Sequence, residues 1–245
     1  MLTRAPVHLL VALAAIPTCW PAIARDPDPA TSSRSTSYAI LGRDPLTGEY
    51  GVAAASHAPL IGMNLEFIDP DAGGVVVLGG PHLELNEKVL IALRDGLAPG
   101  RAIAVGLTGD EEKEDRQVLA LSPAGSAAFT GERLEGFADH RAGNQFVAAG
   151  NRLAGADVLL AMEEAFRGFD GHLADGLLLA LRAARDAGGE EDGAHSAALL
   201  IVGPDARFAT RDRLLDLRID FVAGDAVAAL TRLRAQVDSV YGVVR

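Results

Sequence analysis

The spacing of apolar and polar positions changes along the chain and predicts where its strands lie. Two apolar runs, 38–41 and 51–55, flank the sequence Asp44-Pro45-Leu46-Thr47-Gly48. This pattern predicts a β-hairpin, because proline presets φ and glycine accepts positive φ. The β-branched run at 73–80, bracketed by glycine pairs, indicates a buried strand. Further strands are predicted at 117–122, 126–130, 144–150, 196–202 and 214–221.

Between these runs, apolar residues recur three or four positions apart, which is typical of amphipathic helices. One helix is expected to be capped by Asn86 and ended by Gly96. Others are predicted at 100–107, 156–169, 172–187 and 225–240, and the charged run 110–115 is expected to be a solvated loop. Strands at both ends of the chain with paired helices between them predict a layered α+β domain of two antiparallel or mixed sheets covered by helices.

The first 24 residues have the pattern of a secretion signal. Arg4 precedes an apolar run at 7–16, and Ala22-Ile23-Ala24 fits a signal peptidase site before Arg25. The apolar run is shorter than the roughly 20 residues of a spanning helix. We therefore expect a periplasmic or secreted protein with a signal peptide at 1–24, a linker or propeptide at 25–36 and a single domain at 37–245.

Charge and composition narrow the classes of function. The formal net charge is −11, and removal of 1–24 would leave 21 Lys and Arg against 33 Asp and Glu. Such a surface opposes binding to nucleic acid or to an anionic membrane, and favours a small-molecule or peptide-like substrate. Cleavage would also remove the sole cysteine, Cys19, and with it any disulfide or thiol nucleophile. The sequence lacks the dinucleotide, P-loop, G-x-S-x-G and H-E-x-x-H motifs, so no cofactor is expected.

Several separated motifs resemble a known family. They are SYAILGRDPLTGEYGVAAAS from Ser37, HRAGNQFVAAGNRLAG from His140, the AMEEAF helix, GGEEDGAHSAALLIV and LDLRID from Leu214. In this order, over about 37–235, they resemble the domain of unknown function 1028. That family resembles the N-terminal nucleophile (Ntn) hydrolase superfamily. The resemblance implies a four-layer αββα sandwich of two mostly antiparallel sheets flanked by helices.

The resemblance also implies a chemistry. In Ntn hydrolases a Thr, Ser or Cys at the free N-terminus of the first strand attacks an amide, and its own α-amino group, with a pKa of about 7.7 to 8.0, is the base. The family's strand begins Thr-Phe-Ser-Ile-Val-Ala, which aligns its leading hydroxyl with Ser37. A cut before Arg25 leaves twelve residues ahead of Ser37, so a second cut is needed to free its amine. The acid and lysine of proteasome-like members are absent from the corresponding AAAS and VVVLGG stretches.

The catalytic candidates are Ser37, Ser56 and Asn151. Ser37 is either the nucleophile or an ordinary strand-leading hydroxyl. Ser56 ends the second strand, and antiparallel pairing brings that end to the start of the first. The Asn151 side chain either donates to an oxyanion or caps the following helix.

The substrate-binding candidates lie at other strand ends. His57 follows Ser56, and the pair is either part of the site or a strand-end cap with a surface imidazole. Arg141 is expected, together with His140, at the head of the strand that contains Asn151, where it binds a carboxylate or forms a surface ion pair with Asp139 or Glu135. The remaining candidates are His195 and Ser196, which begin a strand, and Gly79 and Gly80, which either present backbone N–H groups or only make a turn.

The sequence is compatible with two functions. One is an exported amidohydrolase that cleaves a small amide or peptide-like bond. The other is a binding or assembly module of the cell envelope, for example for cell-wall peptides, which has the same fold and no catalysis. No pair among His57, His82, His140, His172 and His195 has metal-ligand spacing, so no metal site is predicted. The sequence leaves a homo-oligomer open.

Overall fold

Two antiparallel sheets form the centre of the fold in this computed structural model, which describes residues 36–80, 82–206 and 213–241. The first sheet has the strand order β10-β9-β2-β1-β8-β7. Its strands are β1 (Ser37–Arg43), β2 (Tyr50–Ser56), β7 (Phe137–Gly143), β8 (Phe146–Leu153), β9 (Ser196–Val202) and β10 (Arg213–Ile219). The second sheet has the order β3-β4-β5-β6, with β3 (Ile68–Asp69), β4 (Gly73–Leu78), β5 (Gln117–Ser122) and β6 (Gly125–Thr130).

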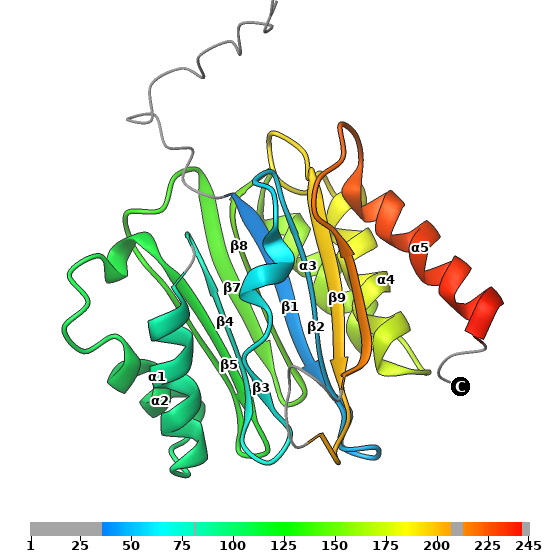
Figure 1. Cartoon of the computed structure of the whole chain (residues 1–245). Coiled ribbons are helices and arrows are strands. Elements are labelled where there is room, and N and C mark those ends of the chain that lie inside the picture. Colours follow the sequence, from blue (N-terminus) through cyan, green and yellow to red (C-terminus); the bar gives the residue numbers. More distant parts are fainter. Residues whose placement is uncertain (1–35, 81, 207–212, 242–245) are drawn as a thin grey trace, which may run out of the picture. The chain divides into compact units, whose positions relative to one another are not determined.

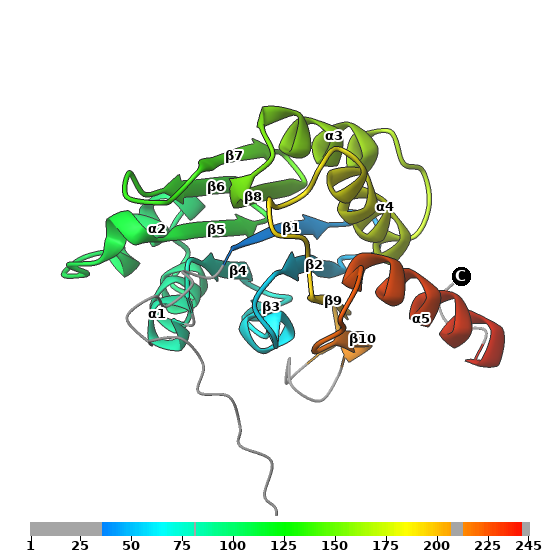
Figure 2. The same cartoon turned by 90° about the horizontal axis from the view of Figure 1, so that it is seen from above.

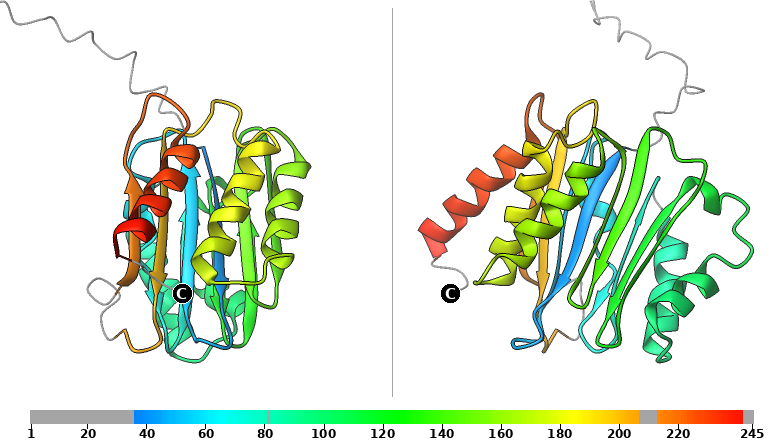
Figure 3. Two further views of the ribbon diagram at one scale, coloured as in Figure 1. Left: turned by 90° about the vertical axis from the view of Figure 1, so that its right-hand side faces the viewer. Right: turned by 180° about the vertical axis from the view of Figure 1, so that it is seen from behind.

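Helices cover the outer face of each sheet (Figure 1). On the second sheet lie α1 (Leu83–Arg94) and α2 (Pro99–Gly106). On the first lie α3 (Ala156–Arg167), α4 (Leu173–Asp186) and α5 (Ala226–Tyr241). Short 3₁₀ turns occur at Ile61–Asn64 and Lys113–Asp115. Figure 2 and Figure 3 show the resulting order of helices, sheet, sheet and helices, so the predicted four-layer αββα sandwich is confirmed.

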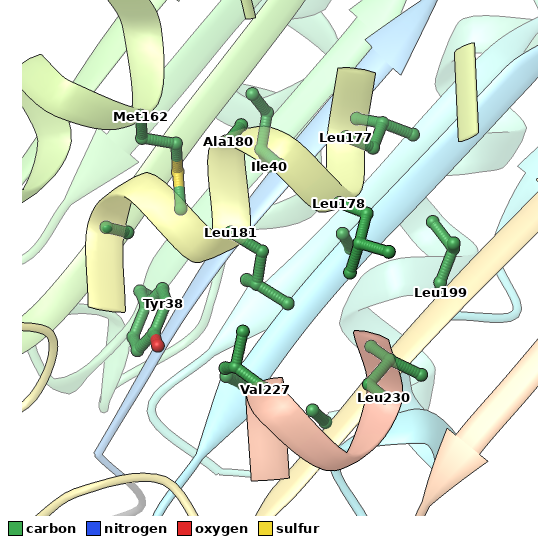
Figure 4. Close-up of a cluster of buried hydrophobic side chains, with 14 of the residues drawn as sticks. Tyr38, Ile40, Met162, Leu177, Leu178, Ala180, Leu181, Leu199, Val227 and Leu230 are labelled. Carbon is green, nitrogen blue, oxygen red and sulfur yellow. The ribbon is translucent and has the colours of Figure 1, made fainter. Parts of the chain in front are cut away.

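Side chains along β1 point alternately to the two faces of the sheet, so this strand contributes to two hydrophobic cores. Tyr38 and Ile40 point toward α3, α4 and α5, where they pack with the apolar side chains in Figure 4. Ala39 and Leu41 point the other way, into the layer between the two sheets. Because both faces are buried, the strand is apolar at nearly every position, and this is the pattern from which it was predicted.

Two details of the predicted elements are wrong. Helix α1 begins at Leu83, so Asn86 lies inside the helix, buried, with its side chain donating to the carbonyl oxygen of His82. The helix starts earlier because Leu85 already belongs to the core under the second sheet.

The second correction concerns the strand expected at 144–150. It is β8, and a separate strand, β7, precedes it. His140 and Arg141 therefore lie on β7 and not on the strand of Asn151. This edge strand, FADHRAG, lacks the apolar run that marked the others.

The predicted signal peptide at 1–24, with its cleavage site before Arg25, lies outside the described residues, and so do 25–35. In the part that is described, no helix is both long and apolar enough to cross a membrane.

Candidate active site

Four polar side chains form one row across the first sheet. Ser37 on β1 pairs with Ser56 on β2 and, on its other side, with Asn151 on β8. Ser56 in turn pairs with Ser196 on β9. The two-residue period of a strand places all four on the face that looks toward the second sheet, in line with Ala39, Ala54, Ala149 and Ala198. None is more than 3% exposed, so the row closes one end of the apolar layer between the sheets.

The two hydroxyls nearest β1 differ in their partners. Ser56 Oγ donates to the backbone carbonyl oxygen of Thr36 at 2.5 Å. That carbonyl belongs to the peptide bond immediately before Ser37. Ser37 Oγ is buried and has no hydrogen-bond partner among the described residues. A buried hydroxyl without a partner costs free energy, and such a group is a candidate for chemistry.

Asn151 is held from the opposite sheet. Its Nδ2 donates to Oε1 of Gln117, the first residue of β5, at 3.0 Å. Gln117 Nε2 lies within 3.2 Å of three acceptors: Thr130 Oγ1 and the carbonyl oxygens of Asp139 and Gly150. The helix that follows Asn151 has Gly155 at its N-cap position, so Asn151 does not cap it. The amide is therefore fixed in the site by a bond that joins the two sheets.

Ser196 has a different environment from its neighbours in the row. Its Oγ donates to the carbonyl oxygen of Ala58 at 2.6 Å and accepts from the backbone N–H of Ile61 at 3.3 Å. These bonds hold the turn that follows β2 against β9. Ser196 thus lies in the row, and its hydroxyl is engaged in supporting the adjacent turn.

Glu190 is a buried carboxyl group beside Thr36. It is 2% exposed, and its Oε2 accepts a hydrogen bond from Thr36 Oγ1. Burial raises the pKa of Glu190 to about 7, against the opposing effects of the Thr36 hydroxyl and the His57 backbone N–H. Asp192 raises this pKa further and Arg152 lowers it. Glu190 and Thr36 were both missed as site residues in the sequence.

His57 and His195 lie together just beyond the row. Their ring centroids are 4.9 Å apart, and Phe221 packs on His195 at 5.6 Å. His57 Nδ1 lies 3.2 Å from the carbonyl oxygen of Gly193, and His195 Nδ1 lies 2.9 Å from that of Val222. Since a carbonyl accepts only from a protonated nitrogen, both rings keep Nδ1–H and leave Nε2 for other partners. The two rings therefore lie beside Ser56 and Ser196, the residues next to them in the sequence.

Gly79 and Gly80 follow β4, whose last residue, Leu78, pairs with Gln117. Both have positive φ, 95° and 132°. A Cβ at Gly79 would lie 2.4 Å from the carbonyl oxygen of Asp115, so this position requires glycine for packing. Nothing lies within 4 Å of a Cβ built at Gly80. The glycine turn therefore stands at the same end of the sandwich as Gln117.

Arg141 is not brought to this site. It pairs with Ala148, whose side chain packs under the helices of the first sheet, so Arg141 is on the face opposite to Ser37. Its Nε donates to Glu163 of α3, which also accepts from Arg167 at 2.8 Å. The ion pair expected with Asp139 or Glu135 is thus made with Glu163. The periodicity of β7 could not be used because β7 itself was not predicted.

A large cavity lies elsewhere, at the other end of β1. Its volume is about 690 Å³, and its lining includes Arg43, Phe146, Phe166 and Arg167. None of the row residues lines it. Among the described residues, no three His, Cys, Asp or Glu side chains converge in a way that could hold a metal ion.

Comparison with known families places the chain. The model of a family of unknown function, DUF1028, matches residues 37–230. The chain belongs to DUF1028. The crystal structure of protein SPO2555 from Silicibacter pomeroyi, described with the same family, is similar to it at 33% identity with a TM-score of 0.75. That alignment covers 83% of this chain and 89% of the other.

Other matches are more remote. Two structures of the Thiobacillus denitrificans protein BPH, the second in complex with epoxomicin, align with TM-scores of 0.37 and 0.35 at 16% and 14% identity. They cover 69% and 70% of this chain and 99% and 100% of theirs. None of the curated proteins compared with the chain matches it. The DUF1028 match begins at Ser37, which is also the first residue of β1.

Proposed function

We propose that this DUF1028 protein is an exported amidohydrolase of the N-terminal nucleophile type, acting on a small amide or peptide-like bond. Ser37 is the nucleophile, and it becomes active when the Thr36–Ser37 bond is cut. Two observations together carry the proposal. The Ser37 hydroxyl is buried and has no partner among the described residues, and the carbonyl oxygen of the preceding residue, Thr36, already accepts a hydrogen bond from Ser56.

The same groups can cut the bond that blocks Ser37. Its Oγ attacks the carbonyl carbon of Thr36, the C–N bond to Ser37 breaks, and the Oγ proton passes to the released amine. The resulting ester is hydrolysed by water, which leaves a carboxylate on Thr36 and a free α-amino group on Ser37. Negative charge develops on the carbonyl oxygen during attack, and the Ser56 hydroxyl already donates to that oxygen.

In the processed protein, one residue supplies both nucleophile and base. The α-amino group of Ser37 has an ordinary pKa of about 7.7 to 8.0 and accepts the Oγ proton near neutral pH. Ser56 donates to the oxyanion, and Asn151, paired with Ser37 and held by Gln117, supplies a second amide donor on the other side of β1. The Gly79-Gly80 turn lies at the same end of the sandwich.

The alternative, a binding module without catalysis, is supported by the positions of the lysines. The chain contains two, Lys88 and Lys113. Lys88 pairs with Glu84 on α1, and Lys113 lies 3.9 Å from Glu114 beside β5. Neither belongs to the row, so the site lacks the lysine that assists the nucleophile of proteasome-like enzymes. In that case cell-wall peptides or similar ligands would bind without turnover.

Intact mass and N-terminal sequencing of the exported full-length chain test the proposal. We expect a terminus at Ser37 for the wild type and at Arg25 for Ser37→Ala, with amide turnover lost in the variant. Ser56→Ala should slow both processing and turnover about 10²-fold, as loss of an oxyanion donor does. Ser122→Ala, at the far end of β5, is the matched serine control and should behave as wild type. A wild-type terminus at Arg25 with activity indifferent to Ser37→Ala would refute the proposal.

A further inference from the structure

We infer that Glu190 selects the acyl half of the substrate, and that the site prefers amides of β-hydroxy acids. This inference rests on the proposed function and names the substrate class of the same site. The preferred acyl group carries a hydroxyl on the second carbon from the carbonyl, as a threonyl or 3-hydroxybutyryl group does.

Thr36 occupies the position that the acyl group of a substrate would take. Its carbonyl oxygen accepts from Ser56 Oγ, and its side-chain hydroxyl donates to Glu190 Oε2. The residue is 3% exposed. Two separate hydrogen bonds therefore fix the carbonyl and the β-hydroxyl of this residue at the same time. A substrate whose carbonyl binds at Ser56 would present its own β-position to Glu190.

Glu190 remains in place when Thr36 departs, because its backbone is held by β8. Glu190 forms a bridge with Leu153, and flanking bonds run from Glu191 N to Arg152 O at 3.0 Å and from Ala154 N to Gly189 O at 3.0 Å. Farther along this loop, Gly193 is tethered to His57. The backbone that carries this carboxyl group is thus fixed by hydrogen bonds to the end of β8.

The carboxyl group has capacity for a further donor, because the nearby His57 backbone N–H lowers its pKa but makes no hydrogen bond to Glu190 Oε1. Glu190 Oε1 is buried and has no hydrogen-bond partner among the described residues. After processing, Oε2 loses the Thr36 hydroxyl as well. A site with a buried polar group left unpaired discriminates strongly against a ligand that lacks the matching donor. A methyl group in place of the hydroxyl should therefore bind poorly.

Two isosteric substrates test the preference in the processed protein. They are the p-nitroanilides of 3-hydroxybutyric acid and of 3-methylbutyric acid, which differ only by hydroxyl against methyl. We expect kcat/KM to favour the hydroxy substrate by about tenfold or more. Glu190→Leu should bring the ratio to about one or below. Glu191→Gln, which alters the neighbouring, half-exposed carboxylate that faces Arg152, should leave it unchanged.

A second measurement covers the case in which Glu190 variants fold poorly. Thr36→Val is isosteric and removes the hydroxyl, whereas Thr36→Ser keeps it. We expect the rate of cleavage before Ser37 to fall about tenfold or more in Thr36→Val and to stay near wild type in Thr36→Ser. Equal processing of both variants together with equal turnover of both anilides overturns the inference while leaving Ser37 catalysis intact. Absence of processing and turnover in the wild type refutes the proposed function, and the inference with it.

Discussion

At the scale of single residues, the row places polar side chains at one end of the largely apolar layer between the sheets. Ser37, Ser56, Asn151, Ser196 and Gln117 are all buried there. Burying polar groups is costly unless each finds a partner, and four of the five do. The exception is the Ser37 hydroxyl. Among these five residues, the one whose side chain has no partner is the one proposed to react.

Replacing Gln117 tests whether the bond between the sheets holds the site. Gln117→Leu keeps the approximate volume but leaves the Asn151 amide and the carbonyls of Asp139 and Gly150 without this partner. We expect the free energy of unfolding to fall by about 2 to 4 kcal/mol. Urea denaturation measures it. Gln236→Leu, on the exposed face of α5, should change stability by less than about 0.5 kcal/mol; an equal loss in both variants would contradict the expectation.

Glu190 should make stability depend on pH. Its pKa is about 7 in the folded chain against an ordinary 4.5, so between these values the folded state holds a proton that the unfolded chain releases. Stability from this group is therefore complete below about pH 4.5 and falls as pH rises through 7. In the Ser37→Ala background, which keeps Thr36 attached, the loss between pH 4 and pH 8 should be about 3 kcal/mol greater with Glu190 than with Glu190→Gln. If urea denaturation gave the same change in the free energy of unfolding with pH for the Glu190 and Glu190→Gln proteins, this prediction would be wrong.

The sequence alone could place together only those candidate residues that local pairing joins, whereas Asn151 and Ser196 were named from their strand ends without a predicted strand order. Ser37 and Ser56 share a hairpin, so their proximity follows from its register. Thr36 and Glu190 are 154 residues apart, and no local pattern joins them. The sequence around Gln117 does contain one sign that this residue belongs to the site. It is a polar residue in step with the buried Leu119 and Leu121, which is unusual for a core position.

At the scale of elements, helix α4 packs very close to β2. Gly51 permits this approach, because a Cβ there would lie 2.5 Å from Ile201 Cδ1 and 2.6 Å from Leu177 Cδ1. The glycine has an ordinary negative φ, so its role is space alone. Helices and hairpins with strong periodicity were predicted within a few residues of their observed bounds. The edge strand β7 was not, because one of its faces contacts solvent and its pattern is weak.

Gly51→Ala should push α4 away from the sheet. We expect a loss of about 1 to 3 kcal/mol, typical of overpacking in a core. Thermal or urea unfolding measures it. Gly100→Ala in α2 is the control, since its nearest neighbour would be Ala127 Cβ at 3.8 Å. That variant should be neutral or up to about 1 kcal/mol more stable, because alanine favours a helix. A neutral Gly51→Ala would show that the helix can shift without cost.

At the scale of the whole molecule, both sheets contribute to one central core, in which Leu119 is completely buried. Leu119→Ala should destabilise by about 2 to 5 kcal/mol. If the sheets unfold together, hydrogen exchange should show the same loss of protection in β1 and in β5. Leu46→Ala, at a turn position that is 94% exposed, should have little effect. Loss of protection confined to β5 would mean that the second sheet opens independently.

The row of site residues has a consequence for how the gene can change. Its members come from four neighbouring strands, of which only β1 and β2 are consecutive in the sequence, and they meet because the strand register pairs them directly across the sheet. A point substitution alters one group and leaves the others aligned. A single inserted or deleted codon within β2, β8 or β9 would turn the residues on one side of it to the opposite face. Length variation among descendants of this gene should therefore collect in the turns, while the strands keep their residue count.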